Sequence, residues 1–180
     1  MSQIKEDHEY EGIRIKFDAL LHKTLIPMQF DISTGDKITP GTEEIEFPQL
    51  LKFEAINVNT YPKETVFAEK AEAMVKLDIA TSRMKDIYDL YILIEMFGNS
   101  LDKKILASAI KITFDHRGTS LPQVPVKVFT EHFYNNQDKM KEWQAFIRSS
   151  SSPDLTLKRT MKIIATFINP LMASILTSQR

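Results

Sequence analysis

The sequence lacks several features that would define a common functional class. It has no cysteine, which excludes a disulfide scaffold, a thiol nucleophile and metal sites built on thiolates. Its 5 glycines and 8 prolines exclude a collagen-like or low-complexity chain. It contains no GxGxxG, P-loop or GxSxG motif, and its 4 histidines are too scattered to form a metal cluster.

Long apolar runs are also missing. The opening MSQIKEDHEY has no apolar stretch, so no signal peptide is predicted. The most apolar segment, residues 163–176, is shorter than the ~20 residues of a membrane span and contains Asn169 and Pro170. We therefore expect a cytoplasmic protein with no membrane contact.

The chain does have the composition of a globular protein, with an uneven charge. Apolar residues make up 43% and charged residues 26% of its 180 residues, which suits one domain with its own core. Residues 1–100 carry 11 Lys and Arg against 18 Asp and Glu, a balance of −7, and residues 101–180 carry 12 against 6, a balance of +6. The basic half indicates either a surface for an anionic partner or a solvated helix surface.

The first 60 residues show the pattern of β-strands. Residues 10–17 and 26–32 alternate apolar and polar side chains, which is the two-residue period of a half-buried strand. Residues 22–24 suit a hairpin turn between them. The following residues predict a loop at 33–41 and short strands at 44–47 and 56–58.

From Pro62 onward the sequence is typical of helices. Pro62 suits a first helical position, and Gly98 and Gly118 suit helix ends. The candidate helix caps are Thr81 or Ser82 and Asn99 or Ser100. His116 and Arg117 close the third helix, where cations offset the helix dipole. The expected helices are 62–77, 83–97, 101–115, 127–136, 138–148 and 155–177, with a hinge at 149–153. The sequence thus predicts an α+β fold in three parts, 1–60, 61–148 and 149–180.

Two of these helices carry charged residues on the side that should face the core. At about 100° per residue, Lys70 falls within the apolar arc of the first helix, and Asp86 and Asp89 fall on the stripe of the second that continues as Leu93. The solvent side of the first helix is expected to carry Glu69, Glu72 and Lys76. An inward lysine needs an anionic partner, so we predict that Lys70 contacts Asp86 or Asp89. This group forms either a polar pocket or a structural ion pair between two helices.

The other chemical candidates lie at the two ends of the chain. Asp31 ends a strand beside a loop, which suits either a ligand of a divalent cation or a solvent-facing strand residue. The last helix groups Lys158, Arg159 and Lys162 on one face, which we expect to be exposed. Its packing face is expected to consist of Leu155, Ile163, Phe167, Leu171 and Ile175.

The central segment resembles a known family. Residues 61–93 (YPKETVFAEKAEAMVKLDIATSRMKDIYDLYIL) are similar to the signature of AbiEii/AbiGii-type nucleotidyltransferase toxins. That signature is AEK, then alanine, arginine and DxxDL, and the matching residues are 68–70, Ala73, Arg83 and 86–90. Residues 26–40 and 112–122 also look like the family, so the resemblance covers about residues 10–148.

The resemblance implies a polymerase-β-type nucleotidyltransferase fold, with residues 10–60 as a remnant of its sheet. It gives Asp31 the role of third carboxylate at the Mg²⁺ site. It makes Lys70, Asp86 and Asp89 catalytic. It places Arg83 and Lys85 against a nucleoside triphosphate. Toxin–antitoxin and phage-defence members further imply an antitoxin partner and an RNA acceptor such as tRNA.

The metal-binding motifs of the family are not among these residues. In the family a Gly-Ser motif and a DxD pair come before the strand at residue 10, and neither occurs in this sequence. We therefore expect a truncated member or one part of a split enzyme, inactive alone. Two alternatives stay open: a non-catalytic module that binds RNA or an antitoxin-like partner, and a helical scaffold.

Overall fold

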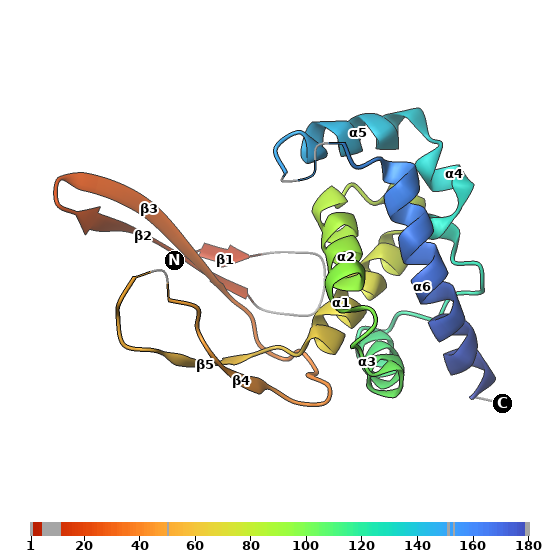
Figure 1. Cartoon of the computed structure of the whole chain (residues 1–180), viewed down its shortest axis with the longest axis horizontal. Helices are drawn as coiled ribbons and strands as arrows, with labels where there is room; N and C mark the ends of the chain where they lie inside the picture. The colour runs from red at the N-terminus through yellow and green to blue at the C-terminus, as the bar shows by residue number, and fades with distance from the viewer. Residues whose placement is uncertain (1, 5–11, 50, 151, 153, 179–180) are drawn as a thin grey trace. The chain divides into compact units, whose positions relative to one another are not determined.

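The computed structural model describes residues 2–4, 12–49, 51–150, 152 and 154–178. The chain divides into two compact units, residues 1–37 and 38–180, which we call the hairpin unit and the helical unit (Figure 1). Small antiparallel sheets come first and helices follow, so the predicted α+β class is confirmed. The three-part division at residues 60 and 148 stays a prediction from the sequence.

The hairpin unit is a three-stranded antiparallel sheet. Its strands are β1 (Ser2–Ile4), β2 (Gly12–Leu21) and β3 (Thr24–Ile32), in the order β1-β2-β3. His22 has a φ of 54° in the tight turn that joins β2 to β3, where the hairpin was expected. Both strands extend further toward this turn than their alternation indicated, and Tyr10 lies outside the described residues. Arg14 pairs with Asp31 across the ladder, which fixes the register of the two faces.

The helical unit opens with a second, two-stranded sheet. The strands β4 (Glu43–Glu46) and β5 (Asn57–Thr60) are antiparallel. The backbone N–H of Thr39 donates to Thr65 Oγ1 at 2.9 Å, and the same hydroxyl donates to the Thr39 carbonyl at 2.9 Å. This pair of hydrogen bonds joins the segment before β4 to the first helix.

Helices make up the remainder of the helical unit. They are α1 (Lys63–Leu77), the 3₁₀ turn η1 (Asp78–Ala80), α2 (Met84–Phe97), α3 (Lys103–His116), the 3₁₀ turn η2 (Lys127–Phe129), α4 (Glu131–Tyr134), α5 (Gln137–Ile147) and α6 (Leu157–Thr177). The single helix expected at 127–136 is thus two short pieces, because Thr130 has an extended backbone between them. Of the expected hinge at 149–153, residues 151 and 153 lie outside the described part of the chain.

The helix caps differ in part from those expected. Asp102, rather than Asn99 or Ser100, caps α3, and its carboxylate accepts hydrogen bonds from the backbone N–H groups of Lys104 and Ile105. A carboxylate that accepts two hydrogen bonds from backbone N–H groups stabilises the start of a helix better than a serine hydroxyl would. This explains why Asp102, and not Ser100, caps α3. Thr81 does not cap α2 itself, but its hydroxyl accepts from the backbone N–H of Arg83, just before that helix.

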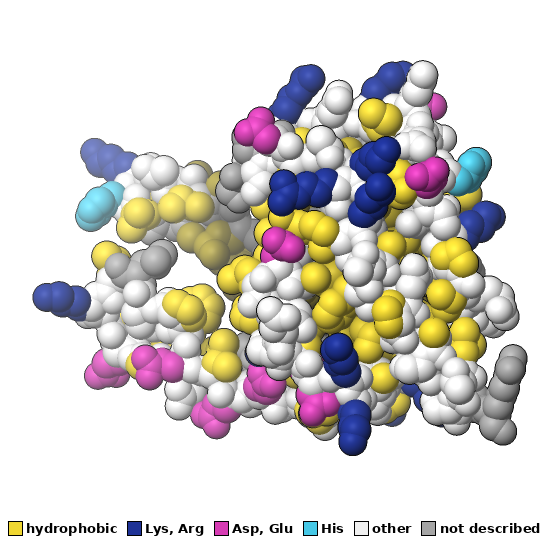
Figure 2. Space-filling model, turned by 45° about the vertical axis from the view of Figure 1, so that its right-hand side comes forward, with side chains coloured by type: hydrophobic (Ala, Val, Ile, Leu, Met, Phe, Trp, Pro, Cys, Tyr) yellow, Lys and Arg dark blue, Asp and Glu magenta, His cyan; other side chains and the backbone are white. Residues whose placement is uncertain are grey.

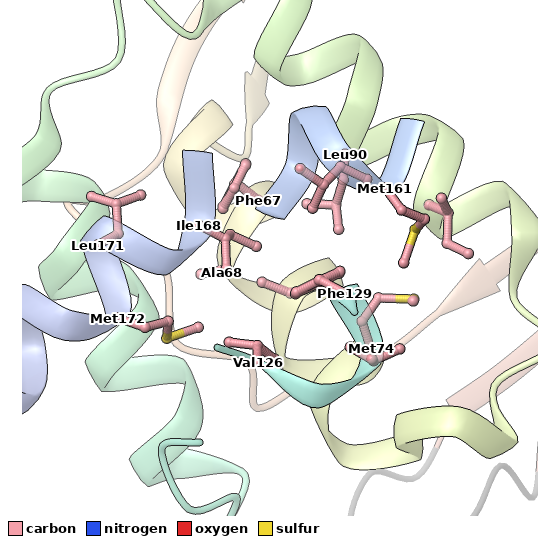
Figure 3. Packing of buried hydrophobic residues seen from close by; sticks show 14 of the residues in the cluster. Phe67, Ala68, Met74, Leu90, Val126, Phe129, Met161, Ile168, Leu171 and Met172 are labelled. Atoms are coloured by element: carbon pink, nitrogen blue, oxygen red, sulfur yellow. The ribbon is translucent and has the colours of Figure 1, made fainter. Parts of the chain in front are cut away.

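The core of the helical unit lies between α1, α2, α3 and α6. Figure 3 shows side chains of α1, α2, η2 and α6 converging on one interior, among them Phe67, Leu90, Phe129 and Ile168. These residues are buried. Because this interior holds α1 against α2, it also fixes the place of the polar residues that the two helices carry.

α6 starts two residues later than expected and ends at Thr177, as expected. It runs for 21 residues and is long and apolar enough, by length and composition, to cross a membrane, although 39% of its most apolar window is buried in the structure. Of the expected packing face, Leu171 and Ile175 are buried, half-buried Phe167 packs against the core, and Ile163 is only half-buried. The buried face consists of Leu157, Thr160, Met161, Ile164, Ile168, Leu171, Met172 and Ile175.

Candidate functional site

The predicted contact between Lys70 and the two aspartates is confirmed. Lys70 Nζ lies 2.8 Å from Asp86 Oδ1 and 2.7 Å from Asp89 Oδ2. The aspartates are three residues apart near the start of α2, so one helical turn aims both at the same ammonium. One lysine of α1 therefore bridges two carboxylates of α2.

Partial burial strengthens the electrostatic interactions within this cluster. The side chains of Lys70, Asp86 and Asp89 are 20%, 20% and 24% exposed, so they lie partly out of water. Burial acts to lower the pKa of Lys70, but its hydrogen bonds to Asp86 and Asp89 outweigh burial and raise this pKa above its ordinary value. Burial likewise acts to raise the pKa of Asp89, and hydrogen bonds from Lys70 and Lys85 lower it on balance. Both shifts favour the charged forms, the ammonium of Lys70 and the carboxylate of Asp89.

Two further cations border the cluster. Lys85 Nζ lies 2.6 Å from Asp89 Oδ2, and Arg83 Nη1 lies 3.9 Å from Asp86 Oδ2. Their side chains are 74% and 52% exposed, so solvent and solutes reach them. Three cations against two carboxylates leave the cluster with a net charge of +1. The fold therefore brings together five of the six site residues predicted from the sequence, all except Asp31.

Lys139 is part of the support of this cluster, and the sequence analysis did not find it. Its Nζ donates a 2.7 Å hydrogen bond to the carbonyl oxygen of Thr81 and lies 3.2 Å from Glu142 Oε2. Thr81 in turn holds the backbone of Arg83. The spacing of Lys139 and Trp143, at i and i+4 on α5, could have placed this lysine on the buried side of that helix.

Glu72 contradicts the predicted solvent face of α1. It is 2% exposed, and its carboxylate lies 3.1 Å from Arg117 Nη1 and accepts a short hydrogen bond from the Thr119 hydroxyl. Arg117 also lies 3.5 Å from Glu69 Oε1. At about 100° per residue, Ala68 falls beside Glu72, and counting this alanine as core would have extended the buried arc to include it. Arg117 thus joins the end of α3 to α1.

Asp31 lies in the hairpin unit, where its carboxylate forms an ion pair with Arg14 of the neighbouring strand. Arg14 Nε and Nη2 lie 2.7 and 2.8 Å from its two oxygens, and Gln29 donates to both oxygens. The hydrogen bond from Arg14 is the main reason that the pKa of this carboxyl is lowered. Its role as a metal ligand stays a prediction.

The described residues do not by themselves fit a magnesium ion. Among them no three histidine, aspartate or glutamate side chains come together in a group that could hold a metal. Asp86 and Asp89 face an ammonium, and Asp31 faces a guanidinium. Mg²⁺ prefers several free oxygen ligands in octahedral geometry.

Comparison with known proteins agrees with the geometry. Residues 1–164 match the family model of the AbiEii nucleotidyl transferase toxin of type IV toxin–antitoxin systems. The chain belongs to the AbiEii family. No curated protein and no solved structure gives a significant match.

Membership of the AbiEii family gives the broad activity class of the chain. The family is one of nucleotidyltransferase-type toxins, which use a nucleotide and a metal and work with an antitoxin partner. The AbiEii match covers the whole of α1 and α2 and therefore the bridged lysine and its neighbours.

Proposed function

We propose that Lys70, Asp86 and Asp89 act in nucleotidyl transfer and that Arg83 and Lys85 bind the phosphates of a nucleoside triphosphate. One observation carries the proposal: Lys70 Nζ lies within 2.8 Å of carboxylate oxygens of both aspartates. An ammonium has three N–H donors, and the two carboxylates take two of them. The third donor is then available to a phosphate oxygen.

The chemistry of nucleotidyl transfer suits such a group. Phosphoryl transfer depends mainly on positioning and on neutralising the charge of the transferred group. The aspartates hold Lys70 in one orientation, so little side-chain freedom is lost when a phosphate arrives. Arg83 and Lys85 are exposed at the border of the cluster, where a triphosphate would first meet the protein.

We also propose that these 180 residues do not transfer nucleotides by themselves. The sequence contains no Gly-Ser motif and no DxD pair, so two of the three carboxylates implied by the family resemblance are not in it. The described residues do not gather a metal-binding group either. The chain would act as one part of a complete enzyme in the cytoplasm.

Two measurements test the two halves of this proposal. In the first, ATP and GTP are titrated with Mg²⁺ into the wild type, Lys70→Ala, Lys85→Gln and the matched control Lys76→Ala, which removes an exposed lysine of the same helix. Weaker binding only in the first two variants is expected. Equal binding by Lys70→Ala and the wild type would contradict the phosphate site.

The second measurement concerns activity. The protein is incubated with labelled nucleotides, Mg²⁺ and total RNA, and incorporation is compared with that of Lys70→Ala. No difference is expected. Robust labelling that depends on Lys70 would show that the chain is active alone.

A second candidate function rests on α6. Lys158, Arg159 and Lys162 are exposed, as expected, and they lie on one face of this helix. We propose a weak interaction surface for RNA, with a tRNA-like acceptor as one case. On the face shown in Figure 2, however, Lys and Arg side chains lie in separate small groups with hydrophobic and neutral atoms between them. This scatter favours weak, sequence-independent contact with phosphates over a defined groove.

A further inference from the structure

An aromatic pair lies beside the charged cluster of α1 and α2: Tyr88 of α2 packs against Phe146 of α5. Their ring centroids are 5.8 Å apart at an interplanar angle of 63°, which is an edge-to-face contact. The ring of Tyr91, about one turn further along α2, lies 6.4 Å from that of Tyr88. Tyr88 and Phe146 are half-buried and pack against the core. Neighbouring rings thus hold Tyr88 in place, while part of its surface is open to solvent.

Tyr88 and the charged cluster occupy adjoining strips of α2. At about 100° per residue, Lys85 projects about 60° from Tyr88 and about 40° from Asp89, so it lies between them. Lys70 of α1 contacts Asp89 on one flank. Phe146 of α5 contacts Tyr88 on the other flank. The side chain of Lys85 is 74% exposed, so an accessible cation lies within one helical turn of an aromatic ring.

This combination suits the two ends of a nucleotide. A nucleoside triphosphate is anionic at one end and carries a flat aromatic base at the other. Stacking of a base on an aromatic side chain improves affinity roughly tenfold. A tyrosine ring that is already held by its neighbours loses little side-chain freedom when the base arrives.

The spacing along α2 matches the spacing within the ligand. Residues three apart on a helix have their Cβ atoms about 5–6 Å from each other, and Lys85 and Tyr88 are such a pair. In a nucleotide a single ribose separates the base from the first phosphate. A base on Tyr88 would therefore direct its phosphates along α2 toward Lys85 and, beyond it, toward Arg83.

We propose that Tyr88 binds the base of the nucleoside triphosphate by stacking, while Lys85 and Arg83 bind its phosphates. The inference rests on the proposed function, because it places the base relative to the phosphate site. Every base has a face that can stack, so Tyr88 separates nucleotides from bare polyphosphates and does not choose among bases. Tyr91 projects about 120° from Lys85 and takes no part in binding.

The test compares a ligand that has a base with one that has none. ATP and inorganic tripolyphosphate are each titrated with Mg²⁺ into the wild type, Tyr88→Leu, Tyr88→Phe and the matched control Tyr91→Leu, which changes a tyrosine of the same helix. The wild type should bind ATP more tightly than tripolyphosphate. Tyr88→Leu should weaken ATP binding about tenfold and leave tripolyphosphate binding unchanged. Tyr88→Phe and Tyr91→Leu should bind both ligands as the wild type does.

The result for Lys70→Ala in the same titrations separates this inference from the proposed function. If Tyr88→Leu binds ATP as tightly as the wild type, or loses both ligands equally, the base site is wrong. If Lys70→Ala binds both ligands as tightly as the wild type, the phosphate site is wrong. A loss of ATP binding confined to Tyr88→Leu would then still support the base site.

A measurement on the wild type covers the case in which the Tyr88 variants do not fold. Irradiation with 8-azido-ATP, which carries its reactive group on the base, attaches the base to the residues around it. Trypsin cuts after Lys85 and Lys103, so residues 86–103 form one peptide. The label should lie on this peptide, at or beside Tyr88, and an excess of ATP should prevent it. Labelling that is confined to other peptides, or that excess ATP does not reduce, would overturn the proposal.

Discussion

Arg117, which follows the last residue of α3, lies 3.1 Å from the buried carboxylate of Glu72 on α1. Glu72 lies within one helical turn of Ala68, Glu69 and Lys70 on α1. This ion pair is therefore made on the turn that also carries Lys70. The orientation of α1, and with it the position of the bridged lysine, thus depends on a contact on the side of the helix away from α2.

Glu72→Ala should unfold the helical unit more easily. The substitution takes the nearer carboxylate from Arg117, which keeps Glu69 at 3.5 Å, and takes the acceptor from the Thr119 hydroxyl, so the loss should be about 1–3 kcal/mol. Urea denaturation followed by circular dichroism measures this loss. Glu72→Leu combined with Arg117→Leu should recover part of it, because apolar side chains then replace both members of the pair. A loss below about 0.5 kcal/mol in Glu72→Ala would show that the pair contributes as little as a surface ion pair.

The Lys70 bridge should stabilise the fold only in a middle range of pH. The pKa of Lys70 is raised above 10.5 in the folded state, so its contribution is lost as the pH rises through the higher folded value. The pKa of Asp89 is lowered below 3.8, so its contribution is lost as the pH falls through the lower folded value. The free energy of unfolding of the wild type should therefore exceed that of Lys70→Met most clearly near pH 7. A difference that stays constant from pH 3 to pH 11 would contradict a charge-based bridge.

Lys139→Met should lower stability and disturb the start of α2. The methionine fills a similar volume but leaves the Thr81 carbonyl without its donor, which costs about 1–3 kcal/mol. Thermal denaturation gives the stability, and titration with ATP shows whether the residues beyond Thr81 have moved. Lys141→Met is the matched control, since that lysine is 74% exposed on the same helix. If Lys139→Met and Lys141→Met lower stability equally, the prediction that Lys139 supports the start of α2 is wrong.

RNA binding through α6 should depend steeply on salt. Replacing Lys158, Arg159 and Lys162 by Gln should reduce the slope of log K against log salt by about 2, since each phosphate contact on a single strand contributes roughly 0.7. Binding is measured by fluorescence anisotropy with a labelled single strand. The control replaces the exposed Lys103, Lys104 and Lys111 of α3, which removes the same charge elsewhere. If the wild type does not bind at low salt, α6 is a solvated surface.

The sequence predicted the strands, most helices and the Lys70 bridge for a clear physical reason. Strand alternation and helical spacing are local, and Lys70, Asp86 and Asp89 lie on two consecutive helices with a short connection. Predicting the bridge required only that the inward-facing sides of these two helices be assigned correctly.

The sequence failed where a partner comes from far along the chain. Glu72 looks solvent-facing until Arg117, 45 residues later, provides its counter-ion. Lys139 likewise needs a carbonyl oxygen 58 residues away. The buried face of α6 was predicted only in part for a related reason. Which side of a largely apolar helix is covered depends on the helices around it, and half-buried Phe167 contacts Phe67 of α1 from the border of that face.

The contact between Trp143 and the segment just before α6 gives the protein an intrinsic fluorescent probe. The chain has one tryptophan, which is 1% exposed, and its indole N–H donates at 2.7 Å to the carbonyl oxygen of Leu155, two residues before α6. Its ring also packs against Phe146 at 5.9 Å. Release of the start of α6 would expose the indole to water and shift its emission to longer wavelength. The fluorescence of the unmodified chain therefore reports whether the start of the C-terminal helix is docked.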